Sequence, residues 1–470
     1  MLGLVVLFAC GDSKSAQPPD AGTPDVPADA PDGPLGDILD ELRAIPGLSV
    51  TEESTMLEGY RFFVMDYDQP VDHDDPAGPH FQQRLTLLHR AYAAPVVVYN
   101  SGYFVSTRGS RTQIAVLTDA NQLSMEYRYF GPSRPEPADW TKLDIRQAAA
   151  DQHQITEALK ARIYAANKWL TTGASKGGMT SLFHRRFFPD DVDATVAFVA
   201  PIDYPEDAVQ SPENRYIQFL DNVGTDPVCR QKLKDFQNTA LARRDAMKTR
   251  MRQEATFTAI LGEDRALEFA VEELPFIFWQ YGGQSGCPAI PGTGASDDAV
   301  FAFLDEIVSV ASYADDDLTA YLPYYHQSAT QLGYPISDES YLAGLLYPGD
   351  DTARAYIPPS IPTPAYDDGA AMHDVQSWLA TSGERIMLIY GQNDPWSAGA
   401  VDLGDAADSF KFIAPGGNHG SSIANLASED AGTATAAVMR WAGLPAHAKR
   451  PFATHERTAE QIELALRRRL

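Results

Sequence analysis

Ser175 stands in a pattern that suits nucleophilic catalysis. It is the central residue of Gly173-Ala-Ser-Lys-Gly177, which matches G-x-S-x-G. Residues 169–172 before it favour a strand, and residues 178–188 after it favour a helix. A nucleophile on such a turn has a strained backbone and needs glycines on either side, where neighbouring elements approach closely. The alternative is a glycine-rich turn that only joins a strand to a helix.

A serine hydroxyl becomes a good nucleophile only when a histidine, itself oriented by an acid, takes its proton. Asp394 and His419 suit these roles because they closely follow predicted strands at residues 385–390 and 410–413. After a serine on this kind of turn, the acid and then the histidine come later in the chain. We therefore predict a triad of Ser175, Asp394 and His419. Four other histidines lack a preceding strand and compete poorly: His153, His184, His326 and His373.

Two backbone N–H groups must stabilise the oxyanion that forms when the serine attacks. The first is expected from Lys176, the residue after the nucleophile. The second is expected from Gly102 or Tyr103, in the loop after a predicted buried strand at residues 95–99. The sequence leaves open that the Lys176 side chain only solvates the surface. This chemistry needs no metal ion and no organic cofactor.

The remaining patterns predict the elements that position these residues. Predicted strands at 58–68 and 84–92 form an antiparallel start, and strands at 121–130 and 194–200 alternate with a helix at 144–166. This alternation predicts an α/β architecture, a mostly parallel sheet with helices on both faces. Combined with the serine motif, it predicts the α/β-hydrolase fold.

The fold is predicted to be interrupted by an insertion. Residues 205–365 are rich in helix formers and acidic residues and contain no clear buried strand, so we expect an inserted helical cap. The sheet would then be built from residues 39–204 and 366–470, and the second part would end in a C-terminal helix.

The first residues predict export. Residues 2–9 are an apolar run, too short for a membrane span of about 20 residues but suited to a secretory signal. The run ends in Leu7-Phe-Ala-Cys10-Gly, which resembles a bacterial lipoprotein processing site, so we expect a signal peptide at 1–10 with lipidation at Cys10. The alternative is an ordinary cleaved signal with a chance cysteine. Residues 11–38 are predicted to be a disordered tether rich in Pro, Asp and Ala, which would leave the protein in the bacterial cell envelope, or secreted.

The charge composition limits the classes of molecule that the protein is expected to bind. The chain has 37 basic and 64 acidic residues, a formal net charge of −27. This field repels polyphosphates, which argues against nucleic acid as a partner, and attracts cationic substrates such as peptides with a free amino terminus. The alternative is that the charge only keeps an exported protein soluble. The two cysteines besides Cys10, Cys229 and Cys287, suit one disulfide in an oxidising compartment.

Two motifs carry a family resemblance. Gly173-Ala-Ser-Lys-Gly-Gly-Met-Thr180 and Met125-Glu-Tyr-Arg-Tyr-Phe-Gly-Pro-Ser-Arg-Pro135 resemble motifs of the bacterial secreted tripeptidyl aminopeptidases, including the prolyl tri/tetrapeptidyl aminopeptidases. The likeness extends from about residue 58 to His419, includes Phe278-Trp-Gln-Tyr281, and reaches more distantly to the lysosomal Pro-Xaa carboxypeptidases. The sequence departs from the pattern at Tyr127, where a histidine is expected. The resemblance implies a capped serine peptidase that removes short peptides, often tripeptides ending in proline, from free amino termini.

Such an enzyme must hold the substrate ammonium with carboxylates and offer an apolar pocket to the residue before the scissile bond. Candidates for the first task are Glu126, Glu272 and Glu273, and candidates for packing a proline ring are Phe276, Trp279 and Tyr281. The alternatives are an ion pair between Glu126 and Arg128, and a cap core built from the aromatic residues. Two other functions stay open, namely an esterase or lipase with the same machinery and an inactive surface lipoprotein that binds peptides.

Overall fold

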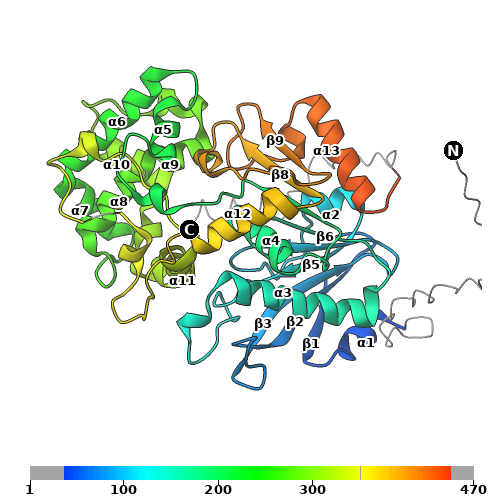
Figure 1. The fold of residues 1–470 in the computed structure, drawn as a ribbon. Coiled ribbons are helices and arrows are strands. Elements are labelled where there is room, and N and C mark those ends of the chain that lie inside the picture. The colour runs from blue at the N-terminus through cyan, green and yellow to red at the C-terminus, as the bar shows by residue number, and fades with distance from the viewer. Residues whose placement is uncertain (1–35, 350, 446–470) are drawn as a thin grey trace, which may run out of the picture.

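The computed structural model describes residues 36–349 and 351–445, whose strands form one sheet of nine in the order β1-β2-β3-β5-β4-β6-β7-β8-β9 (Figure 1). Strands β1, β2, β3 and β5 are joined by antiparallel pairings, and all pairings from β5 to β9 are parallel. The predicted mostly parallel sheet is therefore confirmed. The strands are β1 (Leu48–Glu53), β2 (Arg61–Pro70), β3 (His80–His89), β4 (Val96–Asn100), β5 (Asn121–Met125), β6 (Trp169–Ala174), β7 (Ala194–Phe198), β8 (Ile386–Gly391) and β9 (Phe410–Ala414).

Helices cover both faces of the sheet, as predicted. On one face, α1, α3, α4 and α12 pack their apolar sides against the strands, and α2 and α13 do so on the other. We call the sheet and these six helices the sheet domain. The helices are α1 (Ile38–Arg43), α2 (Gln113–Thr118), α3 (Ile145–Leu159), α4 (Lys176–Phe187), α12 (Ala370–Ser382) and α13 (Ser428–Trp441).

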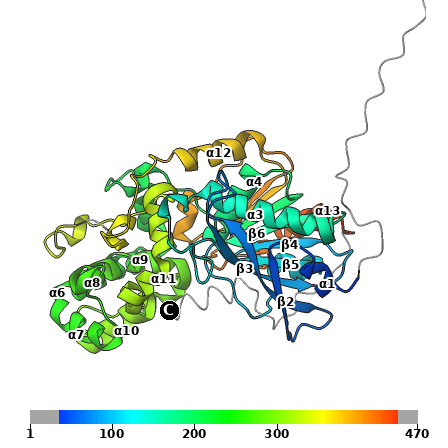
Figure 2. The ribbon, with the colours of Figure 1, turned by 90° about the horizontal axis from the view of Figure 1, so that it is seen from below.

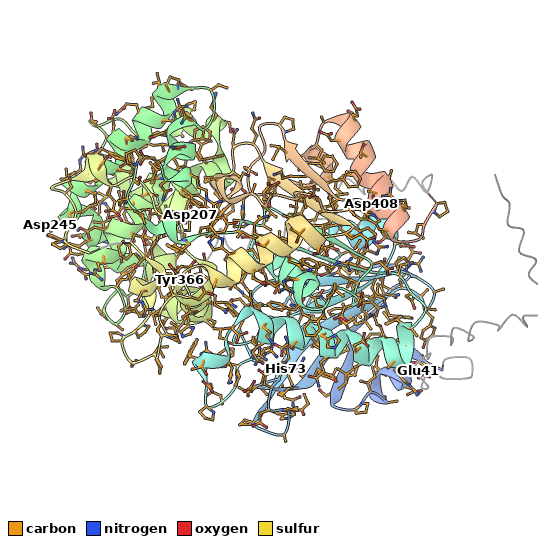
Figure 3. All side chains as sticks on the ribbon, in the orientation of Figure 1. Glu41, His73, Asp207, Asp245, Tyr366 and Asp408 are labelled. Carbon is orange, nitrogen blue, oxygen red and sulfur yellow. A yellow bond between two sulfur atoms is a disulfide. The ribbon has the colours of Figure 1, made fainter. Side chains whose placement is uncertain are left out.

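The chain between β7 and β8 is mainly helical, and its segment from α5 to η9 forms a cap with a hydrophobic core of its own. In both views the cap lies at one end of the sheet (Figures 1 and 2). Cys229 in α6 and Cys287 in η5 form a disulfide within it. Figure 3 shows Asp245 on the outer side of the cap, and Asp207 and Tyr366 where the cap meets the sheet domain. The α-helices of the cap are α5 (Arg215–Asn222), α6 (Pro227–Ala242), α7 (Arg244–Glu254), α8 (Gly262–Glu272), α9 (Leu274–Ile277), α10 (Asp297–Val308) and α11 (Asp315–Gln327).

Short 3₁₀ and π turns, labelled η, fill the connections. Four of them, η4, η6, η7 and η10, border the cavity described below. They are η1 (Trp140–Lys142), η2 (Lys160–Tyr164), η3 (Pro205–Ala208), η4 (Phe278–Gly282), η5 (Gln284–Ala289), η6 (Val310–Tyr313), η7 (Ser328–Leu332), η8 (Ser340–Leu342), η9 (Ala353–Tyr356), η10 (Pro395–Gly399) and η11 (Ile423–Asn425).

The strands differ from the predicted ones at the antiparallel edge. Strand β1 was not predicted, because its side chains are mostly exposed and polar and give no alternating apolar pattern. Strand β5 ends at Met125 instead of continuing to residue 130, because the chain then leaves the sheet and turns at Tyr129, whose φ is 73°.

The predicted signal at 1–10 with Cys10, most of the tether at 11–38, and residues 446–470 at the carboxyl end lie outside the described residues. The first described helix, α1, begins at Ile38. Within residues 36–349 and 351–445, no helix has the length and apolar character that a membrane span requires.

Candidate active site

Ser175 forms the sharp turn between β6 and α4. Strand β6 ends at Ala174 and helix α4 begins at Lys176. The serine has φ 55° and ψ −129°, angles that a residue with a side chain adopts only under strain. Gly177 permits close packing here, since a Cβ atom on it would lie 2.1 Å from the carbonyl oxygen of Asn100. A nucleophile on a strand-to-helix turn requires this combination of strain and close approach.

Asp394 and His419 lie at the same edge of the sheet as Ser175. Strands β6 to β9 are parallel neighbours, and the loops after β6, β8 and β9 carry the serine, the aspartate and the histidine. The Nδ1 atom of His419 is 2.7 Å from Oδ2 of Asp394, and both side chains are buried. The other carboxylate oxygen accepts a hydrogen bond from the Trp396 amide at 3.2 Å. The aspartate is therefore held so that it can orient the imidazole with Nε2 as the basic atom.

The Nε2 atom of His419 is buried and has no hydrogen-bond partner among the described residues, so a bond to Ser175 is not formed in this structure. The imidazole is not itself among the described residues that line the cavity at Ser175, but it contacts two residues that are. Its ring lies 5.9 Å from the ring of Tyr281 and 6.4 Å from that of Trp396, and both residues line a cavity together with Ser175. Catalytic hydrogen bonds are often long before substrate binds. An orphaned basic nitrogen at this position is suited to accept the serine proton.

The loop after β4 faces the first turn of α4, where the oxyanion hole is predicted. A Cβ atom on Gly102 would lie 2.5 Å from the amide nitrogen of Gly177. The Tyr103 amide donates to Oγ of Ser101 at 3.1 Å, which favours Gly102 over Tyr103 as the second donor. The Lys176 side chain does not solvate the surface, because the residue is only 2% exposed. That interpretation of the sequence is wrong.

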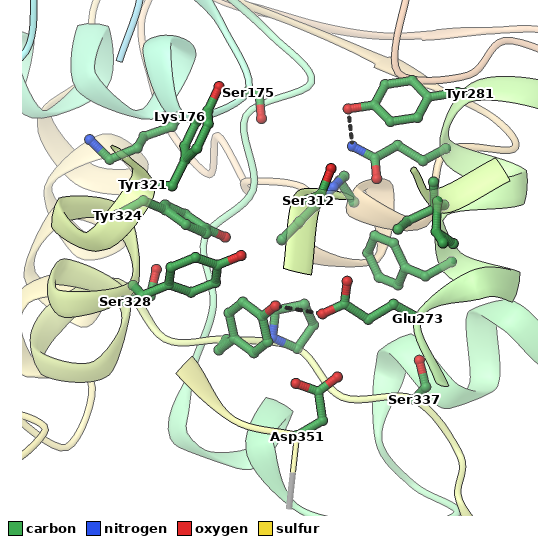
Figure 4. Close-up of a pocket in the computed structure, with 18 of the residues that line it drawn as sticks. Ser175, Lys176, Glu273, Tyr281, Ser312, Tyr321, Tyr324, Ser328, Ser337 and Asp351 are labelled. Carbon is green, nitrogen blue, oxygen red and sulfur yellow. Dashed lines mark hydrogen bonds between the residues drawn. The ribbon is translucent and has the colours of Figure 1, made fainter. Parts of the chain in front are cut away.

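Ser175 opens into a cavity of about 520 Å³ between the sheet domain and the cap (Figure 4). This volume falls in the range of about 300–1,000 Å³ that is usual for ligand sites. The cavity is lined from the sheet domain by residues that include Tyr103, Ser175, Met179, Asp203 and Trp396, and from the cap by residues that include Glu273, Phe276, Tyr281, Asp317, Tyr324 and Asp351.

The cap end of the cavity is acidic, and Figure 4 shows Glu273 and Asp351 at the end of the view away from Ser175. Burial and the charges of Glu273 and Glu272 hold the pKa of Asp351 well above its usual range. Burial also raises the pKa of Asp317 to about 6. Neighbouring carboxyls resist ionisation together, and a bound cation removes that conflict. Tyrosine hydroxyls position the pair. Glu273 accepts from Tyr313 at 2.6 Å and from Tyr334 at 2.8 Å, and the Tyr356 hydroxyl lies between the two carboxyls, 3.0 Å from Glu273 and 2.8 Å from Asp351.

Glu126 is not among the described residues that line this cavity. Its carboxylate is buried in the sheet domain, where it accepts from Oγ of Ser133 at 2.7 Å and from the Val105 amide at 3.2 Å. Burial raises its pKa despite these bonds. Arg128 pairs instead with Asp151, at 2.7 Å for each of two contacts. Both interpretations of Glu126, as an ammonium ligand and as the partner of Arg128, are therefore wrong, because the chain after β5 turns the carboxylate inward.

The predicted aromatic residues separate into two groups. Phe276 and Tyr281 line the cavity, and the Phe276 ring packs edge-on against Trp396 at 5.1 Å. Trp279 is 1% exposed and belongs to the cap core, so its predicted substrate contact is wrong. The π turn η4 directs Trp279 and Tyr281 to different sides, although they are two residues apart. Glu272, next to Glu273, also lies outside the described lining of the cavity.

Sequence reasoning missed Asp351 and the tyrosines that hold the acidic pair. Glu273 and its partner Tyr356 are 83 residues apart, and no short motif joins them. The only signal was a cap rich in acidic and aromatic residues, which does not identify the individual partners.

A nine-stranded, mostly parallel sheet with a strained serine after β6, and an Asp–His pair after β8 and β9, defines the class of α/β-hydrolases. The sequence profile of the family described as PS-10 peptidase S37 matches residues 32–467. The chain is 45% identical over 433 residues to the prolyl tri/tetrapeptidyl aminopeptidase of Streptomyces mobaraensis, a match that covers 90% of this chain and 89% of that protein. The chain belongs to the S37 peptidase family and is a serine-type peptidase.

Similar solved structures are α/β-hydrolases of low sequence identity. A peroxisomal α/β-hydrolase from Saccharomyces cerevisiae is 11% identical with a TM-score of 0.34, over 88% of this chain and 97% of that one. A proline iminopeptidase from Mycobacterium smegmatis is 13% identical with a TM-score of 0.33, over 83% of this chain and 99% of that one. These similarities concern the fold alone.

Proposed function

We propose that this peptidase is an exported aminopeptidase that releases short peptides from free amino termini, with tripeptides ending in proline preferred. The name of the Streptomyces relative supports this substrate class. The observation that carries the proposal is a cavity with Ser175 at one end and the Glu273–Asp351 pair towards the other (Figure 4). A peptide whose ammonium binds that pair presents to the serine a carbonyl group only a few residues along its chain.

The chemistry is that of an acyl-enzyme. Ser175 attacks the peptide carbonyl while His419 takes its proton at Nε2, and Asp394 stabilises the resulting imidazolium through Nδ1. The amides of Lys176 and Gly102 hold the oxyanion. His419 then gives the proton to the leaving amine, and water, activated by the same histidine, releases the short peptide from Ser175.

The acidic end of the cavity supports recognition of the ammonium. The Tyr313 and Tyr334 hydroxyls that donate to Glu273 fix its carboxylate in place, and Asp351 adds a second negative charge when a cation is bound. An acetylated amino terminus has no positive charge and keeps only one of the three N–H donors that this pair would bind. The distance between the pair and Ser175 then sets the number of residues released.

The preference for proline is supported by the rings beside the nucleophile. Phe276 and Trp396 pack at an interplanar angle of 76° and line the cavity with Ser175 and Tyr281. Flat apolar walls suit a proline ring, which carries no amide hydrogen that needs a partner.

The test compares free and acetylated peptides on the wild type and Glu273→Gln. We expect the wild type to cleave only the free peptides, and we expect Glu273→Gln to raise KM at least about tenfold, because a charge-assisted contact is lost. Glu429→Gln, an exposed glutamate in the first turn of α13, is the matched control. Equal cleavage of acetylated and free peptides by the wild type would remove ammonium recognition from the proposal.

The proposal of export includes an anchor at Cys10, behind the tether at 11–38. The disulfide between Cys229 and Cys287 supports an oxidising compartment. Cells expressing the full chain and fed a labelled fatty acid are expected to label the wild type but not Cys10→Ser. An unlabelled wild type in the culture medium would favour a cleaved signal and a secreted enzyme instead.

A further inference from the structure

The side chain of Lys176 is buried beside the nucleophile. The residue is 2% exposed, and its Nζ donates a hydrogen bond to the carbonyl oxygen of Gly102 at 2.9 Å. A buried ammonium loses its hydration, and partners inside the protein must offset this loss. A lysine at this position therefore needs an explanation other than solubility.

Aromatic rings also surround the ammonium. Its Nζ lies 3.2 Å from the centroid of the Tyr127 ring, and 5.5 and 5.6 Å from those of Tyr103 and Phe130. The face of an aromatic ring attracts a cation, most strongly where water is excluded. The Tyr127 hydroxyl accepts a hydrogen bond from Gln327 in α11 at 2.7 Å, so the ring beneath the ammonium is itself anchored to the cap.

The bond from Lys176 to Gly102 joins the two backbone segments that face each other across the proposed oxyanion hole. Lys176 is the first residue of α4 and directly follows Ser175, whereas Gly102 lies in the loop after β4. Because the Gly102 carbonyl accepts the bond, the loop is fixed without using the Gly102 amide. The side chain of one expected donor residue thus holds the loop that supplies the other.

We propose that Lys176 is a positioning residue, whose ammonium sets the separation at which the amides of Lys176 and Gly102 converge on the oxyanion. This inference rests on the proposed acyl-enzyme mechanism at Ser175. Donors placed for the oxyanion stabilise the transition state more than the bound substrate. Loss of the ammonium must therefore lower kcat more than it raises KM.

Lys176→Met tests the role of the ammonium, because it keeps the apolar stem and much of the volume. We expect kcat on a tripeptide substrate to fall about 10- to 100-fold and KM to change less than about threefold. A peptide aldehyde, whose adduct with Ser175 carries the oxyanion, is expected to lose affinity by a similar factor. The product tripeptide, which forms no adduct, is expected to bind as before.

Lys160→Met is the matched control, because Lys160 also lies over an aromatic ring, with Nζ 5.8 Å from the centroid of Trp169, but is not among the described residues that line the cavity. An unchanged kcat in Lys176→Met, or equal losses of affinity for the aldehyde and the product, overturns the proposal. If Lys176→Met does not fold, Tyr127→Leu is the variant that tests the proposal, because it removes the aromatic ring face against the ammonium and leaves the lysine in place. A selective loss of aldehyde affinity then supports the proposal, and an unchanged affinity overturns it.

Labelling with a fluorophosphonate tests the role of Ser175 as the nucleophile independently of the role of Lys176. Labelling of the wild type and of Lys176→Met, but not of Ser175→Ala, shows that the serine is the nucleophile whatever the lysine does. A wild type that is active on peptides but unlabelled at Ser175 overturns both proposals.

Discussion

The backbone N–H of His419 donates to the carbonyl oxygen of Gln280 at 2.9 Å, so the cap holds the loop that carries the imidazole. Asn418 adds a second bond from its side-chain amide to the carbonyl oxygen of Tyr281 at 2.8 Å. On the other side of the site, the Tyr103 ring packs against two tyrosines of α11 at 5.7 and 5.8 Å. The cap therefore supports both loops that complete the site, besides limiting its depth.

Asn418→Ala tests whether this support matters for catalysis. The change removes the bond to Tyr281 and the bond that the Asn418 side-chain oxygen accepts from the Gly420 amide at 3.0 Å. We expect kcat to fall about tenfold because a small displacement of a catalytic group is costly. KM should stay unchanged, because Asn418 is not among the described residues that line the cavity. Steady-state kinetics on a chromogenic tripeptide measure both constants. The matched control is Asn222→Ala in α5, whose side-chain amide donates within its own helix. Identical kinetics in the two variants would mean that the Tyr281 bond does not position His419.

Asp394→Asn is expected to lower kcat by about 10⁴-fold, because an amide facing Nδ1 favours the wrong imidazole tautomer. The fold should persist, since the amide oxygen can still accept from the Trp396 amide. Kinetics and a thermal melt on the same sample separate these effects. Asp402→Asn, an exposed aspartate in the same connection, is the control. A loss of less than about tenfold in Asp394→Asn would contradict its assignment as the triad acid.

The positions of Ser175, Asp394 and His419 could be predicted because each depends on a local pattern. Each residue closely follows a short buried strand, and parallel neighbours bring the ends of such strands to one edge. Strand β1 could not be predicted in this way, because an exposed edge strand carries little apolar alternation.

The acidic end of the cavity could not be predicted because it is assembled by the tertiary fold of the cap. The Tyr356 hydroxyl lies within hydrogen-bonding distance of both Glu273 and Asp351, and Glu273 is 83 residues away from Tyr356 in the chain. The orientation of Trp279 depends on a π turn that follows no simple residue period. The burial of Lys176 likewise depends on rings from another segment of the chain.

Gly177→Ala tests the close packing at the nucleophile turn. The new Cβ would lie 2.1 Å from a backbone oxygen that cannot move without disturbing β4. We expect loss of nearly all activity and a destabilisation of about 1–3 kcal/mol or more. The matched control is Gly432→Ala in α13, where a Cβ meets nothing within 4 Å. That change should stabilise the helix by about 0.5–1 kcal/mol, so the two melting temperatures should shift in opposite directions. A fully active Gly177→Ala would show that the turn tolerates a side chain.

Asp203 lies at the boundary between the cap and the sheet domain, and its ionisation makes the stability of the protein depend on pH. Burial, with the charge of Asp207, raises its pKa to about 7. An unfolded aspartate titrates near about 3.9, so between about pH 4 and pH 7 the folded protein keeps a proton that the unfolded chain has lost. The unfolded state binds fewer protons over this window, and the stability of the fold therefore falls as the pH rises through it.

Asp203→Asn removes the buried carboxyl whose ionisation destabilises the fold, and it keeps an oxygen that can accept from the Tyr216 hydroxyl. We expect the variant to match the wild type near pH 4 and to exceed it at pH 8 by up to about 4 kcal/mol, at about 1.4 kcal/mol for each pKa unit. Melting temperatures measured from pH 4 to pH 8 check this dependence, and Asp402→Asn is the exposed control. A wild type as stable as the variant at pH 8 would mean that Arg215, 3.8 Å from the Asp203 carboxylate, already neutralises its charge.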